Sequence, residues 1–150
     1  MSMFNIFNVS GSAVSAQSQR LNTVASNLAN VDTVAGTDGK AYRARQVVFQ
    51  TELMSQGDGS GMPAIGQADG VGSGAGVRVS NVTESDTPGR KVMDPKHPQA
   101  DAEGYVTYSN VNAVEEMVNM ISASRSYQNN VDVMNTAKTL LMKTLSLGQG

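Results

Sequence analysis

The last third of this chain, from Asn112 to Leu147, has the sequence pattern of one long amphipathic helix. No Pro or Gly interrupts it before Gly148, and apolar residues recur every three or four positions, with one longer gap bridged by Ser124. The apolar positions are Val114, Met117, Ile121, Tyr127, Val131, Met134, Ala137, Leu141 and Leu145. Such a helix would be about 50 Å long, more than the roughly 30 Å diameter of a small domain. Something beyond a small domain must therefore cover much of this stripe.

Both ends of this segment carry helix signals. Asn112 is a good N-cap, and Glu115 completes a capping-box-like start. Acidic residues stand in the first turns and Lys138 and Lys143 stand near the end, an order that complements the helix dipole.

Residues 4 to about 31 form a second helix candidate with a short heptad pattern. Four apolar residues fall seven positions apart and two valines interleave with them: Phe7, Val14, Leu21, Leu28, Val24 and Val31. Gly11 and its serine neighbours weaken the first half, so we expect the segment before Ala13 to become ordered only against a partner. Arg20 is the only charged residue up to position 31. A solvated face normally carries Lys and Glu, so this helix is suited to contacts on more than one side. The alternative is a weak surface helix.

The segment 27–33 is predicted to end this helix. Asn27 and Asn30 tolerate the left-handed backbone of a helix end, and their amides can bond nearby backbone groups.

Between the helices, runs of β-branched and aromatic residues predict strands at 42–50, 77–83, 90–93 and 105–108, with a turn at 87–89. Residues 55–76 hold 8 of the 15 glycines and are predicted to form a loop. Residues 70–75 superficially match a dinucleotide-binding pattern. Because a strand-like segment rather than a helix follows, this context argues against nucleotide binding.

No group of side chains indicates catalysis, a cofactor or a metal. The chain has no Cys, and its only histidine, His97, stands between prolines. The acidic residues near Asp101 lack the further ligands of a calcium loop. Arg43 and Arg45 could bind a phosphate, but two cations on a strand more often belong to a solvated face or form salt bridges. We expect no catalytic, cofactor-binding or metal-binding residues.

Composition also limits the partners. A net charge of -2 gives no general attraction to nucleic acid or anionic membranes. No apolar run approaches the ~20 residues that span a bilayer. The N-terminus lacks the basic region of a secretory signal, so any export is expected to leave the chain uncleaved.

These patterns predict an α+β fold with three parts: an N-terminal helix within 1–35, a β-rich insert at 36–110, and a C-terminal helix within 111–150. The two helices should pair antiparallel as a coiled-coil-like core, crossing near +20°. Each helix buries only one side in this way. We therefore expect arms that are frayed in the monomer and helical in an assembly. An ordinary helical hairpin with a polar outside is the alternative.

The C-terminal helix also carries an amide-rich surface, which can hydrogen-bond across a contact without the desolvation penalty of ions. We predict an assembly interface that combines the apolar stripes with amides. It comprises Phe7, Val14, Leu21, Val24, Asn27, Leu28, Asn30, Val31, Val114, Met117, Ile121, Tyr127, Gln128, Asn129, Val131, Met134, Leu141 and Leu145.

Several stretches resemble the axial proteins of the bacterial flagellum, which build its rod and hook. They are residues 4–7, 11–13, 15–22 and 25–30, then 42–44 and 47–50, and finally 114–118 and 120–131. The Ser-Asn-Leu-Ala-Asn element at 26–30 is shared across that family. The segments at 42–50 and 114–131 are most similar to members of the proximal rod.

This resemblance implies a structural subunit of the proximal rod of the basal body. Its terminal helices would pack around the export channel, and it would transmit torque from motor to hook. It implies type III export without signal cleavage and a position in the rod across the periplasm. Implied partners are further copies of the chain, other proximal and distal rod proteins, the junction protein FliE at the MS ring, and the export apparatus, but neither nucleic acid nor inserted membrane.

Three alternatives stay open. The chain could be a different rod or hook paralogue. It could be a wall-degrading enzyme associated with the rod, which predicts a catalytic carboxylate in a cleft. It could also be a coiled-coil adaptor, although that class predicts more charge pairs flanking the seam.

Overall fold

The computed structural model describes residues 3–36, 38–54 and 74–148. Its elements, in chain order, are α1 (Met3–Ala29), β1 (Arg45–Met54), β2 (Gly74–Glu84), β3 (Lys91–Met93), β4 (Tyr105–Thr107) and α2 (Ala113–Leu147). The predicted α+β class is confirmed: the two terminal helices flank a small antiparallel β insert in the sequence.

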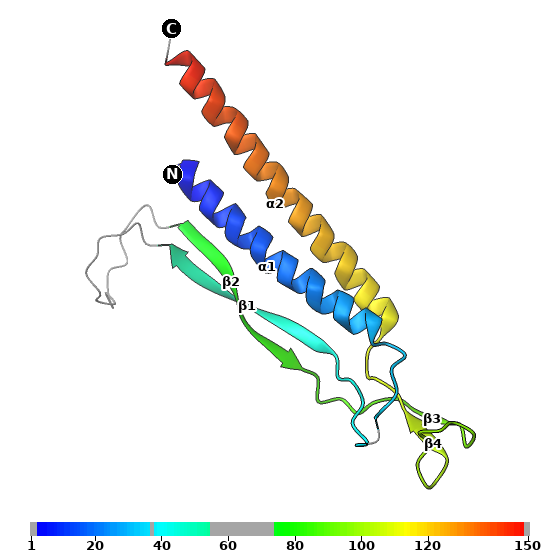
Figure 1. The fold of residues 1–150 in the computed structure, drawn as a ribbon. Helices are drawn as coiled ribbons and strands as arrows, with labels where there is room; N and C mark the ends of the chain where they lie inside the picture. Colours follow the sequence, from blue (N-terminus) through cyan, green and yellow to red (C-terminus); the bar gives the residue numbers. More distant parts are fainter. Residues whose placement is uncertain (1–2, 37, 55–73, 149–150) are drawn as a thin grey trace, which may run out of the picture.

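The helix α1 lies between α2 on one side and the β1–β2 hairpin on the other (Figure 1). The two helices run antiparallel, and the small β3–β4 sheet sits near the end where α1 finishes and α2 begins. At the opposite end α2 reaches past the start of α1. No helix in the described ranges is long and apolar enough to cross a membrane.

The hairpin has one apolar face because of its register. Directly opposite residues share a face of the sheet, and Val47 pairs with Val82 while Phe49 pairs with Val79. A register shift after Val48 leaves Ser80 as the extra residue of a bulge. The glycines at 74 and 76 belong to β2, so the predicted Gly-rich loop extended too far at this end; positions 55–73 lie outside the described residues. The strand predicted after these glycines is present.

The start of α1 differs from the prediction, since the helix runs without interruption from Met3 through Gly11. Contacts within the chain stabilise the first half of α1. Ser12 Oγ donates to the carbonyl of Val9 at 2.7 Å and accepts from the backbone N–H of Val77 at 3.1 Å. The hairpin thus takes the place of the partner that the sequence indicated.

The end of α1 also differs in its mechanism. No non-glycine residue among those described has a positive φ, so the expected left-handed asparagine is absent there. Instead, Asn30 Nδ2 donates to the carbonyl of Ser26 at 2.8 Å, and the chain leaves the helix through turns. The local amide bond was correctly predicted, but the backbone geometry was not.

The helix α2 begins and ends where the sequence indicated. Asn112 is the N-cap, and its side chain accepts a hydrogen bond from the N–H of Val114 at 3.1 Å. Gly148 follows the last helical residue. The side of α2 that faces α1 matches the predicted stripe only in part. Its buried residues are Glu116, Ala123 and Ala137, of which only Ala137 was predicted, while Met117 and Ile121 are exposed. Residues outside the predicted stripe therefore form the first half of the seam between the helices.

We expect the small side chain of Ala123 to set the spacing between the helices, because it is 0% exposed. The Ala123→Leu variant should lose about 1–3 kcal/mol of unfolding free energy through overpacking. Urea denaturation followed by circular dichroism measures this loss. Ser122→Leu, on the exposed side of the same turn, is the control and should change stability by less than about 0.5 kcal/mol. Equal effects of both variants would contradict the observed seam.

Candidate assembly interface

The side chain of Asn27 joins the end of α1 to the start of β1 and to the segment just before that strand. It is 0% exposed. Its Nδ2 donates to the carbonyl of Arg45 at 2.8 Å, and its Oδ1 accepts from the N–H of Arg45 at 2.9 Å. The same oxygen accepts from the hydroxyl of Tyr42 at 3.0 Å. Asn27 therefore pairs with the first residue of β1 as a neighbouring strand would, although it lies on a helix.

Further polar side chains hold the start of α2 to the insert. Asn110 Oδ1 accepts from the N–H of Ala44 at 2.6 Å, and Asn110 Nδ2 donates to the carbonyl of Thr87 at 2.7 Å. Ser109 is buried, and its hydroxyl donates to the carbonyl of Val31 at 2.7 Å. These bonds place the end of α1, the start of β1 and the start of α2 at one junction.

Glu116 brings a carboxyl into the same junction from α2. It is 6% exposed, and its Oε2 has no hydrogen-bond partner among the described residues. Burial raises the pKa of this carboxyl, as does nearby Glu115, whereas a hydrogen bond with Asn27 and the charge of Arg20 lower it. Arg20 itself donates to Asn119 Oδ1 at 3.2 Å across the helix pair. The seam between the helices is thus polar at this end.

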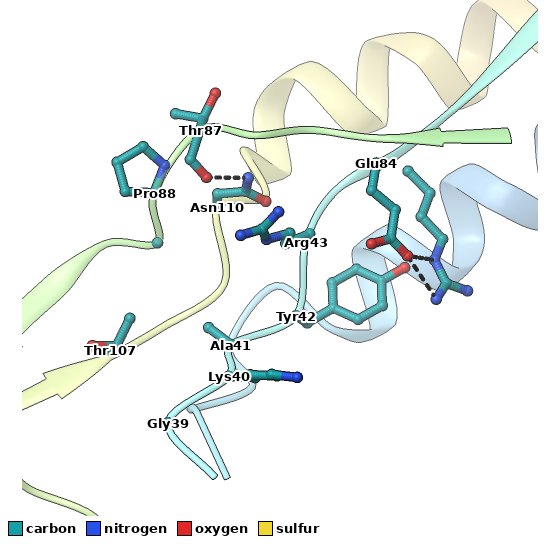
Figure 2. A pocket seen from close by; sticks show the side chains of 12 residues that line it. Gly39, Lys40, Ala41, Tyr42, Arg43, Glu84, Thr87, Pro88, Thr107 and Asn110 are labelled. Atoms are coloured by element: carbon teal, nitrogen blue, oxygen red, sulfur yellow. Dashed lines mark hydrogen bonds and ion pairs between the residues drawn. The ribbon is translucent and has the colours of Figure 1, made fainter.

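A groove of about 580 Å³ opens beside the junction, between the segment leading into β1 and the passage from β2 to β3 (Figure 2). Glu84 is the one carboxylate side chain among the residues that line it, and it forms an ion pair with Arg45 at 3.1 Å. Arg43 pairs with Asp86 at 3.3 Å. Both arginines therefore form exposed salt bridges, one of the two alternatives to a phosphate site. The described residues hold no cluster of acidic or His side chains able to bind a metal ion.

The predicted interface residues fall into two groups. Those covered wholly or partly within the chain are Phe7, Val14, Leu21, Val24, Asn27, Leu28, Asn30, Val31, Val131, Met134 and Leu141. Those on the surface are Val114, Met117, Ile121, Tyr127, Gln128, Asn129 and Leu145. The second group lies entirely on the exposed surface of α2.

Sequence reasoning missed the role of Glu116 and the bridging role of Asn27. One signal for the seam was available: Glu116, Ala123, Asn130 and Ala137 are seven residues apart, a heptad of small and polar side chains. Apolar periodicity selected only Ala137 of these four, because just two of them are apolar.

Comparison with known proteins identifies both ends of the chain with flagellar sequences. Residues 7–36 match the family model described as Flagella basal body rod protein. Residues 102–147 match the one described as Flagellar basal body rod FlgEFG protein C-terminal. The two matches cover most of α1 and all of α2, but not the start of β1.

Similarity to individual proteins extends over the whole chain. The chain is 54% identical over 149 residues to the flagellar basal-body rod protein FlgC of Yersinia enterocolitica and 52% identical over 149 residues to that of Escherichia coli O157:H7. It is 42% identical over 153 residues to FlgC of Bacillus subtilis. Each alignment covers 99% of this chain and 100% of the relative.

We predict that Asn27→Ala destabilises the fold by about 2–4 kcal/mol, because it removes the hydrogen bonds of a buried amide to both backbone groups of Arg45. Urea denaturation measures the change. Asn22→Ala is the matched control, since Asn22 is exposed on the same helix, and it should shift stability by less than about 0.5 kcal/mol. A loss at Asn27 no larger than at Asn22 would show that the junction does not depend on this amide.

Glu116 should make stability depend on pH. Its folded-state pKa lies above the ordinary 4.5, so the folded state binds more protons than the unfolded state in that range. Its contribution is fully present below about pH 4.5 and is lost as the pH rises through the folded-state pKa. We expect the stability of Glu116→Gln relative to the parent protein to rise over that interval and then level off. Urea denaturation from pH 4 to 8 measures it.

The shifted carboxyl of Asp101 does not produce the same effect. The backbone N–H of Tyr105 lowers the pKa of Asp101 below 3.8, so the stability from Asp101 is present above that value and is lost only at lower pH. Parallel curves for Glu116→Gln and the parent would refute the assignment to Glu116.

Proposed function

Because the chain belongs to the FlgC family of flagellar basal-body rod proteins and is a structural subunit of that rod, we propose that it builds the proximal rod through its two terminal helices. In this proposal α1 and α2 form the inner layer around the export channel and the β insert lies outside. The observation that carries the proposal is the large number of apolar side chains on the surface of α2.

The exposure of these side chains supports assembly through the helices. Val114 is 71% exposed, Ile121 56% and Leu145 64%. Soluble proteins that act alone seldom leave such residues clustered on one helix, and clusters of this kind mark protein interfaces. The amides of Gln128 and Asn129 are also exposed, and they can bond across a contact at low desolvation cost.

The proposed mechanism is mechanical. Torque from the motor would pass through many helix contacts in parallel, each contributing a modest free energy, on the way to the hook. The antiparallel pair suits this load, because α1 is held by α2 on one side and by the hairpin on the other.

The proposed neighbours are further copies of the chain, other proximal and distal rod proteins, and FliE at the MS ring. Export through the type III apparatus and a position across the periplasm belong to the same proposal. They rest on the family membership and on the helical surfaces described above.

An enzymatic role has little support from the junction groove. Glycosidases use two carboxyl groups flanking the scissile bond, whereas Glu84 is the one carboxylate side chain lining the described groove and is held by Arg45. A different rod or hook paralogue is also disfavoured, because FlgC proteins align with 99% of the chain. We therefore propose a structural, non-enzymatic subunit.

The proposal predicts that a charge in the exposed stripe of α2 blocks assembly without unfolding the chain. Met117→Asp should reduce swimming at least tenfold in a strain that lacks its own copy of the gene, and the variant should be missing from purified basal bodies. Met93→Asp is the matched control: Met93 is 65% exposed on β3 and Met117 is 52% exposed on α2. Normal motility with Met117→Asp, at normal protein levels, would contradict assembly through this surface.

A further inference from the structure

A second pocket, of about 400 Å³, lies where α1, β1 and α2 meet. Because α1 lies between α2 and the hairpin (Figure 1), the lining of this pocket comes from all three elements. Glu115 and Glu116 line it from α2, Arg20 from α1 and Arg45 from β1, and we call it the carboxyl pocket. A partner that enters the carboxyl pocket would therefore contact both helices and the hairpin at once.

Glu116 leaves an unpaired hydrogen-bond acceptor in this pocket. The residue is 6% exposed, and its Oε2 has no hydrogen-bond partner among the described residues. The carboxyl also has a hydrogen bond with Asn27, so a partner has one free oxygen to bind. A buried acceptor that lacks a donor costs free energy. The carboxyl pocket therefore favours a ligand that brings one donor to Oε2.

The charges that line the carboxyl pocket favour a cation. Arg45 forms an ion pair with Glu84 at 3.1 Å, so its charge is already balanced. Among the described lining residues, this leaves the carboxyls of Glu115 and Glu116 against the guanidinium of Arg20. With both carboxylates ionised, the excess of one negative charge attracts a cationic group.

The shape of the carboxyl pocket distinguishes a lysine from an arginine. One free carboxyl oxygen suits the single-point contact of an ammonium group, whereas the fork of a guanidinium binds best to two adjacent acceptors. Val24, Val47 and Phe49 also line the pocket, and the methylene groups of a lysine can pack along them. The ligand that fits is a primary ammonium on an aliphatic stem.

A protein side chain is a better source of this ammonium than a free amine. A small free amine loses its translational and rotational freedom on binding and has few atoms that could offset the loss. A lysine on a docked protein has already lost that freedom. The net charge of -2 on this chain also favours a basic partner over a second copy.

We propose that the carboxyl pocket receives a lysine side chain from a different protein of the rod, and that the lysine ammonium donates to Oε2 of Glu116. The inference rests on the proposed function and identifies a recognition site for one neighbour. The buried carboxyl then serves an interface as well as the fold.

Carbodiimide crosslinking tests this contact, because it joins a carboxylate to a lysine amine where the two touch. Purified basal bodies are treated, digested and analysed by mass spectrometry, and fragmentation distinguishes Glu116 from Glu115. We expect an amide link between Glu116 and a lysine of a different rod protein. Glu116→Gln should reduce the yield of this link at least tenfold. Asp132→Asn, exposed on the same helix, is the control and should leave the yield unchanged.

Incorporation into basal bodies gives a second measurement. Glu116→Gln removes the charge and keeps the size of the side chain, so we expect no loss of stability in urea denaturation at neutral pH. Its amount in purified basal bodies should nevertheless fall at least threefold, whereas Asp132→Asn should be incorporated like the parent chain. Equal incorporation of the two variants would show that Glu116 serves only the fold.

The remaining outcomes overturn the inference or its basis. Links at other carboxyls with none at Glu116 refute it and leave the proposed function standing. A link from Glu116 to a lysine of this chain overturns the assignment to a different protein. A shift of the Glu116 carboxyl NMR signal by millimolar butylamine in the isolated protein would make a free amine the ligand. Absence of the parent chain from basal bodies would instead refute the proposed function.

Discussion

The hydrogen bonds of the Asn27 side chain are the interaction on which the rest of the structure depends. The amide lies in the interior and bonds both backbone groups of Arg45 as well as the hydroxyl of Tyr42. Leaving such groups unpaired in the interior would cost more than the bonds themselves contribute. The end of α1 is thereby fixed to the start of β1, and through Glu116 it also meets the start of α2. The helices extend from this junction in one direction, and the small β3–β4 sheet lies at the same end (Figure 1).

Away from the junction, the chain buries small residues and exposes large ones. Within the described residues, the buried apolar side chains are two valines and four alanines, whereas eighteen large hydrophobic side chains are exposed. Alanine burial removes little apolar area, so folding alone gains little free energy from these helices. Each neighbour that covers an exposed Val, Met, Ile or Leu adds free energy that the isolated chain lacks. This distribution favours a subunit that reaches its full stability in an assembly.

The elements could be predicted from the sequence because their signals are local. Asn112 caps its own helix, and the strand at Val77 follows from neighbouring valines. The face of α2 that meets α1 could not be read in the same way. Two stripes with steps of three and four residues run along α2, and only contacts distant in sequence, such as Arg20 with Asn119, choose between them. The role of Asn27 was hidden for the same reason, since its partner Arg45 lies 18 residues away. Apolar periodicity selected the surface residues of the predicted interface other than Gln128 and Asn129, but it did not show on which side of α2 they lie.

Burying the carboxyl of Glu116 in the seam costs free energy, but this carboxyl favours one register of the helix pair. The seam positions of α2 repeat every seven residues and hold Ala123, Asn130 and Ala137 after Glu116. A slip of one heptad would keep small or polar residues in the seam and change packing little. Only Glu116 presents a carboxyl to Asn27 and Arg20, so the slipped pair loses that hydrogen bond and that charge.

A polar residue at one seam position is a known means of fixing register. Here the register also sets how far α2 extends beyond α1, because a one-heptad slip would change that length by about 10 Å. The same carboxyl that weakens the fold above its pKa therefore sets how far α2 extends beyond α1.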